Sequence, residues 1–221
     1  HRVDRRQRQM CIRDSVLAGR TQTGATWHLP VIGRHTLIVG ASGSGKGSPL
    51  WSVVGNLASA VPTGEVQLWG IDLKHGLELS MGKPLFCCMA TTPAQALEVL
   101  RQLMKVIEAR GAVMAGVSRL HQPRPGDPLH VLVIDELAVL TSYGPPEVVK
   151  EASRLLSEVL TQGRALGVVV LGAVQDPRKE IVGMRNLFTK ALALRLNSST
   201  ETRMVLGLSL IHISEPTRQE A

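Results

Sequence analysis

The chain has 221 residues, of which 44% are hydrophobic, and a formal net charge of +7. This length and apolar content are sufficient for one domain with a substantial core. No apolar run approaches the ~20 residues that span a bilayer, and the N-terminus lacks the layout of a signal peptide. Since three cysteines do not make a complete set of disulfides, we expect a soluble, cytoplasmic domain in which Cys87 and Cys88 pack in the core.

The two ends of the chain differ in character from its middle. Residues 1–15 are arginine-rich and lack periodicity, and residues 208–221 interrupt what should still be domain. Both ends resemble strings that recur when adapter or library sequence is translated at the edges of assembled reads, so we expect them to be non-native. The alternative for residues 1–15 is a disordered basic arm that grips phosphates. Without both ends the middle remains basic, which permits a polyanionic partner without establishing one.

In chain order, the first predicted strand of the domain covers residues 35–39 and runs directly into a glycine-rich loop. In such a loop, successive backbone N–H groups turn inward around a phosphate chain, and a lysine reaches the outer phosphates from the start of the next helix. We therefore expect a helix directly after the lysine. The predicted phosphate-binding residues are Gly40, Ala41, Ser42, Gly43, Ser44, Gly45, Lys46, Gly47 and Ser48. This loop indicates a nucleotide-binding protein.

Two strands and a long helix are predicted next. The strands cover residues 66–70 and 85–89, and the helix begins at Thr92 as N-cap. Pro93 is suited to the first helical position, and Gln95 completes a capping box with Thr92. Apolar residues at helical spacing continue to Gly111, where we expect the regular stretch to end or to end shortly after.

The strand predicted at residues 130–135 ends in two carboxylates, Asp135 and Glu136. In P-loop enzymes the strand-end aspartate holds the magnesium shell, directly or through water. An adjacent glutamate can polarise the attacking water as a general base. Because the loop and the acid pair occur together in this order, the sequence favours nucleotide hydrolysis over binding alone.

The rest of the domain continues the alternation of helices and strands. A helix is predicted after Pro146 with Gly167 as its C-terminal stop, followed by strands at 167–173 and 190–196. This alternation predicts an α/β fold with a mostly parallel sheet sandwiched by helices. Along the chain, a complete helix-and-strand unit separates the strand at 35–39 from the strand at 130–135. We therefore expect another strand to lie between these two in the sheet. That arrangement is typical of RecA-like P-loop NTPases, and we assign residues 16–207 to one such motor domain, incomplete at its C-terminus.

Four stretches resemble the FtsK/SpoIIIE DNA translocases, especially the actinobacterial branch that includes plasmid-transfer proteins. They are residues 33–52, which contain the loop, 71–80 (IDLKHGLELS), 131–140 (VLVIDELAVL) and 163–180, which run from GRALG to LGAVQDPRKE. The resemblance implies a hexameric motor that uses ATP and Mg²⁺ to pump double-stranded DNA. It also implies that any membrane contact is made through a region absent from this chain.

The resemblance also assigns roles to individual residues. Lys46 and the loop would hold the phosphates, Asp135 the magnesium and Glu136 the hydrolytic water. Gln175, just after the predicted strand 167–173, would be the polar residue that senses the γ-phosphate. A cation from a neighbouring subunit would stabilise charge in the transition state. The candidates for that cation are Arg164, Lys190, Arg195 and Arg203.

Two positions depart from the family pattern. Most relatives carry Ser or Thr directly after the loop lysine, whereas here Gly47 follows and Ser48 comes one residue later, about 100° round the helix. Because the actinobacterial branch shares this GKGS pattern, we interpret it as a working variant in which Ser48 or water completes the metal site. Lys190 replaces an arginine found in many relatives and lacks its planar fork, which weakens its case as the trans-acting cation.

The cargo of the motor stays open at this point. The leading hypothesis is a DNA translocase in chromosome segregation or conjugative plasmid transfer. The alternatives are a secretion ATPase of the same family that moves protein, and a non-hydrolysing nucleotide-binding module that serves assembly. An aromatic content of 3% fits a duplex partner gripped through its phosphates better than a single strand stacked on rings. The turn at residues 177–179 and Arg185 are candidates to face a central channel.

Overall fold

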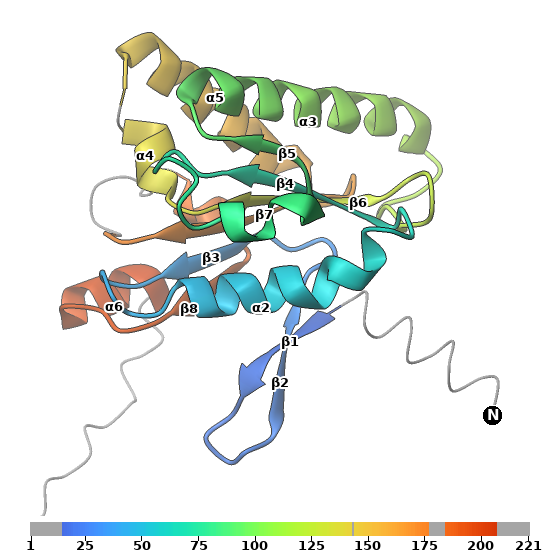
Figure 1. The fold of residues 1–221 in the computed structure, drawn as a ribbon. Coiled ribbons are helices and arrows are strands. Elements are labelled where there is room, and N and C mark those ends of the chain that lie inside the picture. Colours follow the sequence, from blue (N-terminus) through green and yellow to red (C-terminus); the bar gives the residue numbers. More distant parts are fainter. Residues whose placement is uncertain (1–14, 143, 177–183, 207–221) are drawn as a thin grey trace, which may run out of the picture.

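The computed structural model describes residues 15–142, 144–176 and 184–206. Six strands form one sheet in the order β5-β4-β6-β7-β3-β8, and every neighbouring pair is parallel (Figure 1). The strands are β3 (Thr36–Val39), β4 (Val66–Ile71), β5 (Phe86–Ala90), β6 (Leu129–Ile134), β7 (Val168–Val174) and β8 (Lys190–Ala193). The strand β7 lies between β3 and β6, which confirms the intervening strand expected from the sequence.

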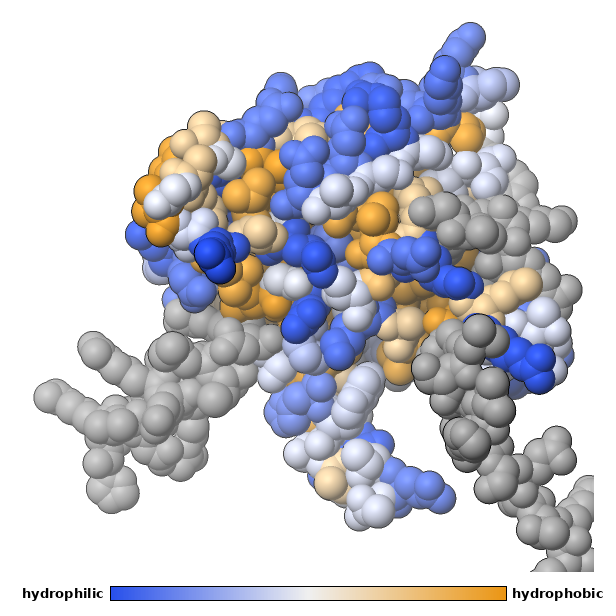
Figure 2. All heavy atoms as spheres, turned by 180° about the vertical axis from the view of Figure 1, so that it is seen from behind, coloured by the Kyte–Doolittle hydropathy of each residue, from blue (hydrophilic) through white to orange (hydrophobic). Residues whose placement is uncertain are grey.

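Helices cover both faces of the sheet, as predicted (Figure 1). On one face lie α3 (Pro93–Met114) and α5 (Pro146–Gln162), and on the other lies α2 (Gly47–Leu57). The shorter helices are α4 (Leu137–Ser142) and α6 (Ser199–Leu206), and 3₁₀ turns cover Ala58–Ala60, Ser80–Leu85 and Arg185–Leu187. Seen from behind, the outer surface over α3 and α5 is mainly hydrophilic (Figure 2), as expected for amphipathic helices packed on a sheet.

Two hydrophobic clusters form the core, one on each face of the sheet. Successive side chains of a strand point to opposite faces, so each buried strand contributes to both clusters. Leu132 and Ile134 of β6 pack in the cluster under α3 and α5, whereas Val131 and Val133 pack in the cluster under α2. All residues of β6 and β7 are buried, which is typical of parallel strands covered on both faces. The two clusters hold the carboxyl ends of these strands in place.

An antiparallel hairpin precedes the sheet and was not predicted. It comprises β1 (Ser15–Arg20) and β2 (Thr26–Pro30) and projects on the α2 side of the molecule (Figure 1). Two side chains of α2 attach it, since Ser52 Oγ and Asn56 Nδ2 donate to the carbonyl of Leu17 at 2.8 and 3.1 Å. Most of the residues we expected to be non-native, 1–14 and 208–221, lie outside the described ones.

The capping box of α3 is confirmed, because the Thr92 side chain accepts a hydrogen bond from the backbone of Gln95 and the reciprocal bond is present. Two other predictions were wrong. Helix α5 ends at Gln162 and not at the predicted stop, Gly167, because the chain turns at Gly163. The carbonyl of Gly163 accepts the N–H of Val168 at 2.9 Å, and β7 begins at Val168. Cys87 and Cys88 are exposed, because β5 is an edge strand whose pairing with β4 is irregular and only partly covered.

Candidate nucleotide-binding site

The glycine-rich loop connects β3 to α2 at the carboxyl edge of the sheet. Gly43 and Gly45 have φ angles of 68° and 85°, a region that glycine adopts without steric cost. A Cβ atom added to Gly40 would collide with Ser44 Oγ and would lie 3.0 Å from Leu194 Cβ. The glycines therefore allow the backbone to curl tightly over the start of α2.

Lys46 lies inside this curl. Its Nζ donates to the carbonyl oxygens of Gly40 at 2.8 Å and Ala41 at 3.2 Å. Burial lowers the pKa of Lys46, and the nearby carboxylate of Glu136 opposes this shift. Ser44 Oγ is buried and makes no hydrogen bond with any residue that the structure describes. A curled loop that offers an ammonium group and an unused hydroxyl fits a phosphate chain.

The acid pair follows β6 directly, two strands away from the loop in the sheet. The Glu136 side chain is only 6% exposed, and each of its oxygens has a partner. Lys74 Nζ lies 3.3 Å from Oε2, and the backbone N–H of Gln175 donates to Oε1 at 3.1 Å. Lys74 Nζ also lies 3.8 Å from Asp135 Oδ2. The ends of β4, β6 and β7 thus meet at one carboxylate.

Negative charge exceeds positive charge around Asp135. The pKa of Asp135 is raised to about 6, chiefly by burial; Lys74 opposes this shift, and the carboxylates of Asp72, Glu78 and Glu136 contribute to it. Carboxylate oxygens are the ligands that Mg²⁺ prefers, and a divalent cation would offset this excess charge. The residues at the end of β6 therefore fit a magnesium ion.

The turn after β4 brings two more charged residues to the site. Asp72 is fully buried, and its carboxylate accepts the backbone N–H groups of Lys74, Glu78 and Leu79 at 3.1, 2.9 and 3.0 Å. This turn directs Lys74 to the acid pair and Glu78 to the start of α2, where Trp51 Nε1 donates to Glu78 Oε1 at 3.1 Å. From the sequence, residues 71–80 indicated only the family resemblance. The available signal was charged residues directly after a strand of the same parallel sheet.

The four candidate trans-acting cations lie in different places. Arg195 Nη2 donates to the carbonyl of Ser42 at 2.9 Å and so contacts the loop of its own chain. Lys190 begins β8 and Arg164 precedes β7, so both belong to the opposite, amino edge of the sheet. Arg203 is exposed on α6.

The remaining predicted residues lie near the loop or beyond the described chain. Ser48 is exposed in the first turn of α2, and its backbone N–H donates to Gly45 O at 3.0 Å. Gln175 is half-buried directly after β7. The turn at 177–179 lies outside the described residues, and Arg185 begins the short 3₁₀ turn before β8.

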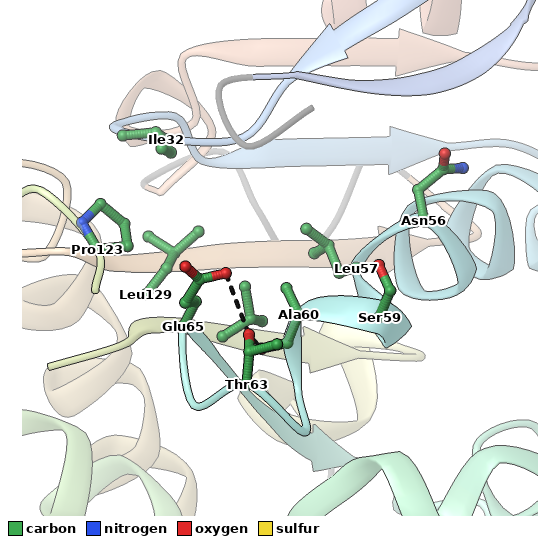
Figure 3. A pocket seen from close by; sticks show the side chains of 10 residues that line it. Ile32, Asn56, Leu57, Ser59, Ala60, Thr63, Glu65, Pro123 and Leu129 are labelled. Carbon is green, nitrogen blue, oxygen red and sulfur yellow. Dashed lines mark hydrogen bonds between the residues drawn. The ribbon is translucent and has the colours of Figure 1, made fainter. Parts of the chain in front are cut away.

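A separate cavity of about 280 Å³ lies at the amino edge of the sheet (Figure 3). Ile32, Leu57 and Leu129 line it, and Thr63 Oγ1 donates to Glu65 Oε2 at 3.1 Å beside it. Its lining comes from the end of α2 and the starts of β4 and β6, whereas the loop and the acid pair lie at the carboxyl ends of the strands. This cavity is therefore distinct from the nucleotide site.

A family model described as the FtsK/SpoIIIE family matches residues 8–221. The chain belongs to the FtsK/SpoIIIE family. This confirms the predicted family, and the sheet order and flanking helices confirm the predicted RecA-like fold. The chain is accordingly a P-loop ATPase domain with a site for nucleotide. The matched range includes residues 8–15 and 208–221, which lie in the two ends that we expected to be non-native.

Several curated relatives of this chain carry the name DNA translocase FtsK. The chain is 25% identical over 194 residues to the DNA translocase FtsK of Staphylococcus aureus (strain COL), and 26% identical over 187 residues to that of Helicobacter pylori (strain ATCC 700392 / 26695). Each alignment covers 78% of this chain but only 24% and 21% of the two relatives. The chain thus spans about a quarter of the length of the curated relatives it matches.

Two solved structures share the fold of this FtsK/SpoIIIE domain. The pCW3 conjugation coupling protein TcpA, in its monomer form with ATPγS, is 21% identical with a TM-score of 0.75 over 88% of this chain and 58% of its own. The cytoplasmic domain of the Thermomonospora curvata type VII secretion ATPase EccC is 24% identical with a TM-score of 0.68 over 88% of this chain and 25% of its own. At these identities the similarity shows the fold alone. Within the described residues, no helix combines the length and apolarity needed to cross a membrane.

Proposed function

We propose that this chain is the ATP-hydrolysing motor domain of a double-stranded DNA translocase. The observation that carries the proposal is the Glu136 carboxylate, held between Lys74 Nζ and the backbone N–H of Gln175 at the edge that bears the phosphate loop. A buried, fixed carboxylate beside a phosphate site is what a general base for water requires. The curated relatives from Staphylococcus aureus, Borreliella burgdorferi and Helicobacter pylori are named DNA translocases, which supports DNA as the cargo.

Each predicted site residue has a part in the proposed reaction. Lys46 exchanges its two loop carbonyls for the outer phosphates, and the backbone N–H groups of residues 40–48 receive the rest of the chain of phosphates. Glu136 takes a proton from the attacking water. Gln175 senses the γ-phosphate, and its backbone bond to Glu136 links that sensor to the base. Mg²⁺ would be held by Asp135, with Ser48 or water, and would neutralise phosphate charge.

The proposed working form is a homo-hexameric ring in the cytoplasm with ATP between neighbouring subunits. A cation from the adjacent subunit would complete each site, and its candidates are Arg164, Lys190, Arg195 and Arg203. Double-stranded DNA would be gripped through its phosphates by basic groups, in keeping with the net charge of +7. The role of the whole protein would be chromosome segregation or conjugative plasmid transfer.

ATP hydrolysis by this chain, measured with and without double-stranded DNA, tests the proposal. We expect DNA to stimulate hydrolysis, and Glu136→Gln to lower the stimulated rate by about 100-fold or more while ATP binding persists. Glu108→Gln removes the same charge from an exposed position on α3 and should leave the rate unchanged.

The other outcomes separate the alternatives. Hydrolysis that is abolished by Glu136→Gln but indifferent to DNA would favour a secretion ATPase that moves protein. Binding of ATP without turnover would favour a nucleotide-binding module that serves assembly. Either result would contradict the DNA motor.

A further inference from the structure

Gly47, the residue directly after the loop lysine, packs against the carboxylate of Glu78. A Cβ atom added to Gly47 would collide with Glu78 Oε1 and would lie 3.3 Å from Glu78 Cδ. At this position, P-loop proteins usually carry Ser or Thr, whose hydroxyl binds Mg²⁺. In this chain a carboxylate oxygen from the turn after β4 lies where that side chain would begin.

The Glu78 side chain is held in this position from two directions. Its backbone N–H is fixed by the buried carboxylate of Asp72 at 2.9 Å, so the turn after β4 is not free to move away from α2. Trp51 Nε1, one helical turn after Gly47, donates to Glu78 Oε1 at 3.1 Å. These two contacts fix the Glu78 carboxylate beside the start of α2, next to the phosphate-binding loop.

The nearby cations are committed to other partners. Lys46 Nζ binds two loop carbonyls, and Lys74 Nζ lies between Asp135 and Glu136. Among the residues that the structure describes, none forms an ion pair with Glu78 within 4.0 Å. The negative charges of Glu78 and Asp135 interact across the site. Glu78 thus lies beside the first residue of α2 with no ion-pair partner among the described residues, close enough to Asp135 for the two negative charges to repel each other.

We propose that Glu78 is a side-chain ligand of the nucleotide-bound divalent cation beside Asp135, in place of the hydroxyl that the loop lacks at position 47. The inference rests on the proposed function, because the cation arrives with the nucleotide. A carboxylate is a better ligand for Mg²⁺ than a hydroxyl. Ser48 is a weaker candidate because it is exposed and points about 100° away from Gly47 on the helix. Without the metal, Glu78 would repel phosphate, so nucleotide binding should depend strongly on the cation.

The affinity for a fluorescent ATP analogue, measured in MgCl₂ and in EDTA, tests this ligand without requiring turnover. In the unaltered chain we expect Mg²⁺ to tighten binding. Glu78→Gln keeps an oxygen for Trp51 but removes the charge, so the gain from Mg²⁺ should fall by about tenfold, while binding in EDTA is unchanged or tighter. A purely structural role would instead weaken binding equally in both buffers, which would overturn the proposal.

Two further variants decide between the candidate ligands. Ser48→Ala should keep the full gain from Mg²⁺, and loss of the gain in this variant but not in Glu78→Gln would make Ser48 the ligand. The double variant Gly47→Ser with Glu78→Ala supplies a hydroxyl and the space for it, and should recover most of the gain. Failure to recover it would count against the proposal.

The failure of this inference and of the proposed function are distinguishable. Metal-dependent binding that Glu78→Gln leaves unaltered would overturn the role of Glu78 and retain the ATPase. If the unaltered chain binds no nucleotide in either buffer, both the ATPase and the ligand are wrong.

Discussion

Lys74 is the cation shared by the two carboxylates that end β6. Its Nζ lies 3.3 Å from Glu136 Oε2 and 3.8 Å from Asp135 Oδ2, and it comes from the turn after β4. A buried carboxylate is costly unless a charge partner or hydrogen bonds compensate it. Lys74 therefore lowers the cost of keeping Glu136 ionised in a position where it can act as a base.

Replacing Lys74 should shift the pH dependence of hydrolysis. Burial holds the pKa of Asp135 at about 6, and Lys74 is the charge that pulls it down. In Lys74→Met this attraction is lost, so the pKa should rise above 6. We expect the acid limb of the pH profile of kcat/KM for ATP to move to higher pH, because this limb reports groups of the free enzyme.

A second lysine provides the control for this prediction. Lys105→Met removes the same charge from an exposed position on α3, far along the chain from the acid pair, and should leave the profile in place. An acid limb that moves to lower pH in Lys74→Met, or equally in both variants, would contradict the electrostatic role of Lys74.

At the scale of elements, the junction between α5 and β7 depends on one glycine. A Cβ atom at Gly163 would lie 2.6 Å from the backbone oxygens of both Val159 and Val168. Backbone oxygens cannot rotate away as a side chain can, so the helix end and the strand start approach each other only if residue 163 has no side chain. This close approach sets where β7 begins and hence where it ends, at Val174 directly before Gln175.

Alanine substitutions at two glycines should therefore have opposite effects on stability. Gly163→Ala should lower the free energy of unfolding by about 1–3 kcal/mol because it overpacks the junction. Gly111→Ala in α3 meets only Leu166 Cδ1 at 3.8 Å and should raise that free energy by roughly 0.5–1 kcal/mol. Urea denaturation of both variants measures the difference, and a stabilising Gly163→Ala would show that the junction is looser than described.

At the scale of the whole molecule, two buried neutral histidines make the stability of the fold depend on pH. His35 accepts the N–H of Val170 on Nδ1 at 2.9 Å, which leaves Nε2 to donate to Leu160 O at 3.0 Å, so its ring is neutral. His130 accepts Trp69 Nε1–H on Nδ1 at 3.0 Å and is likewise neutral. Burial lowers the pKa of each to about 4, from 6.5. Both rings join elements across the core, so their protonation bears on the entire fold.

Stability should therefore fall as the pH is lowered from 6.5 towards 4. In this window the unfolded chain binds protons that the folded chain does not, which costs up to about 3 kcal/mol for each histidine. Asp135, whose pKa is raised to about 6, acts in the opposite direction and offsets part of the loss. Denaturation across this pH range measures the slope.

Single histidine variants identify the source of that slope. His35→Gln should flatten it, whereas the same change at the exposed His28 should not. A wild-type free energy of unfolding that is constant between pH 6.5 and 4 would contradict the assignment of both buried rings.

The sequence by itself determined the fold class, the family and the two local motifs of the site. The alternation of strands and helices, the glycines of the loop and the capping box of α3 depend on neighbours within a few residues, so they are visible in the sequence. Predictions failed where the environment came from distant parts of the chain, as for the exposed Cys87 and Cys88 on an irregular edge strand and for the end of α5. The hairpin β1–β2 was missed because few of its residues are buried.

Only the tertiary structure decided which charges meet. Lys74 and Glu136 are 62 residues apart, and Gln175 is a further 39 residues on, yet the order β4-β6-β7 places their strand ends side by side. The contact of Glu78 with Gly47 likewise depends on how α2 packs below the end of β4. Local sequence carries no information on these distances, because sheet order is set by the packing of two hydrophobic faces and not by the residues at the strand ends.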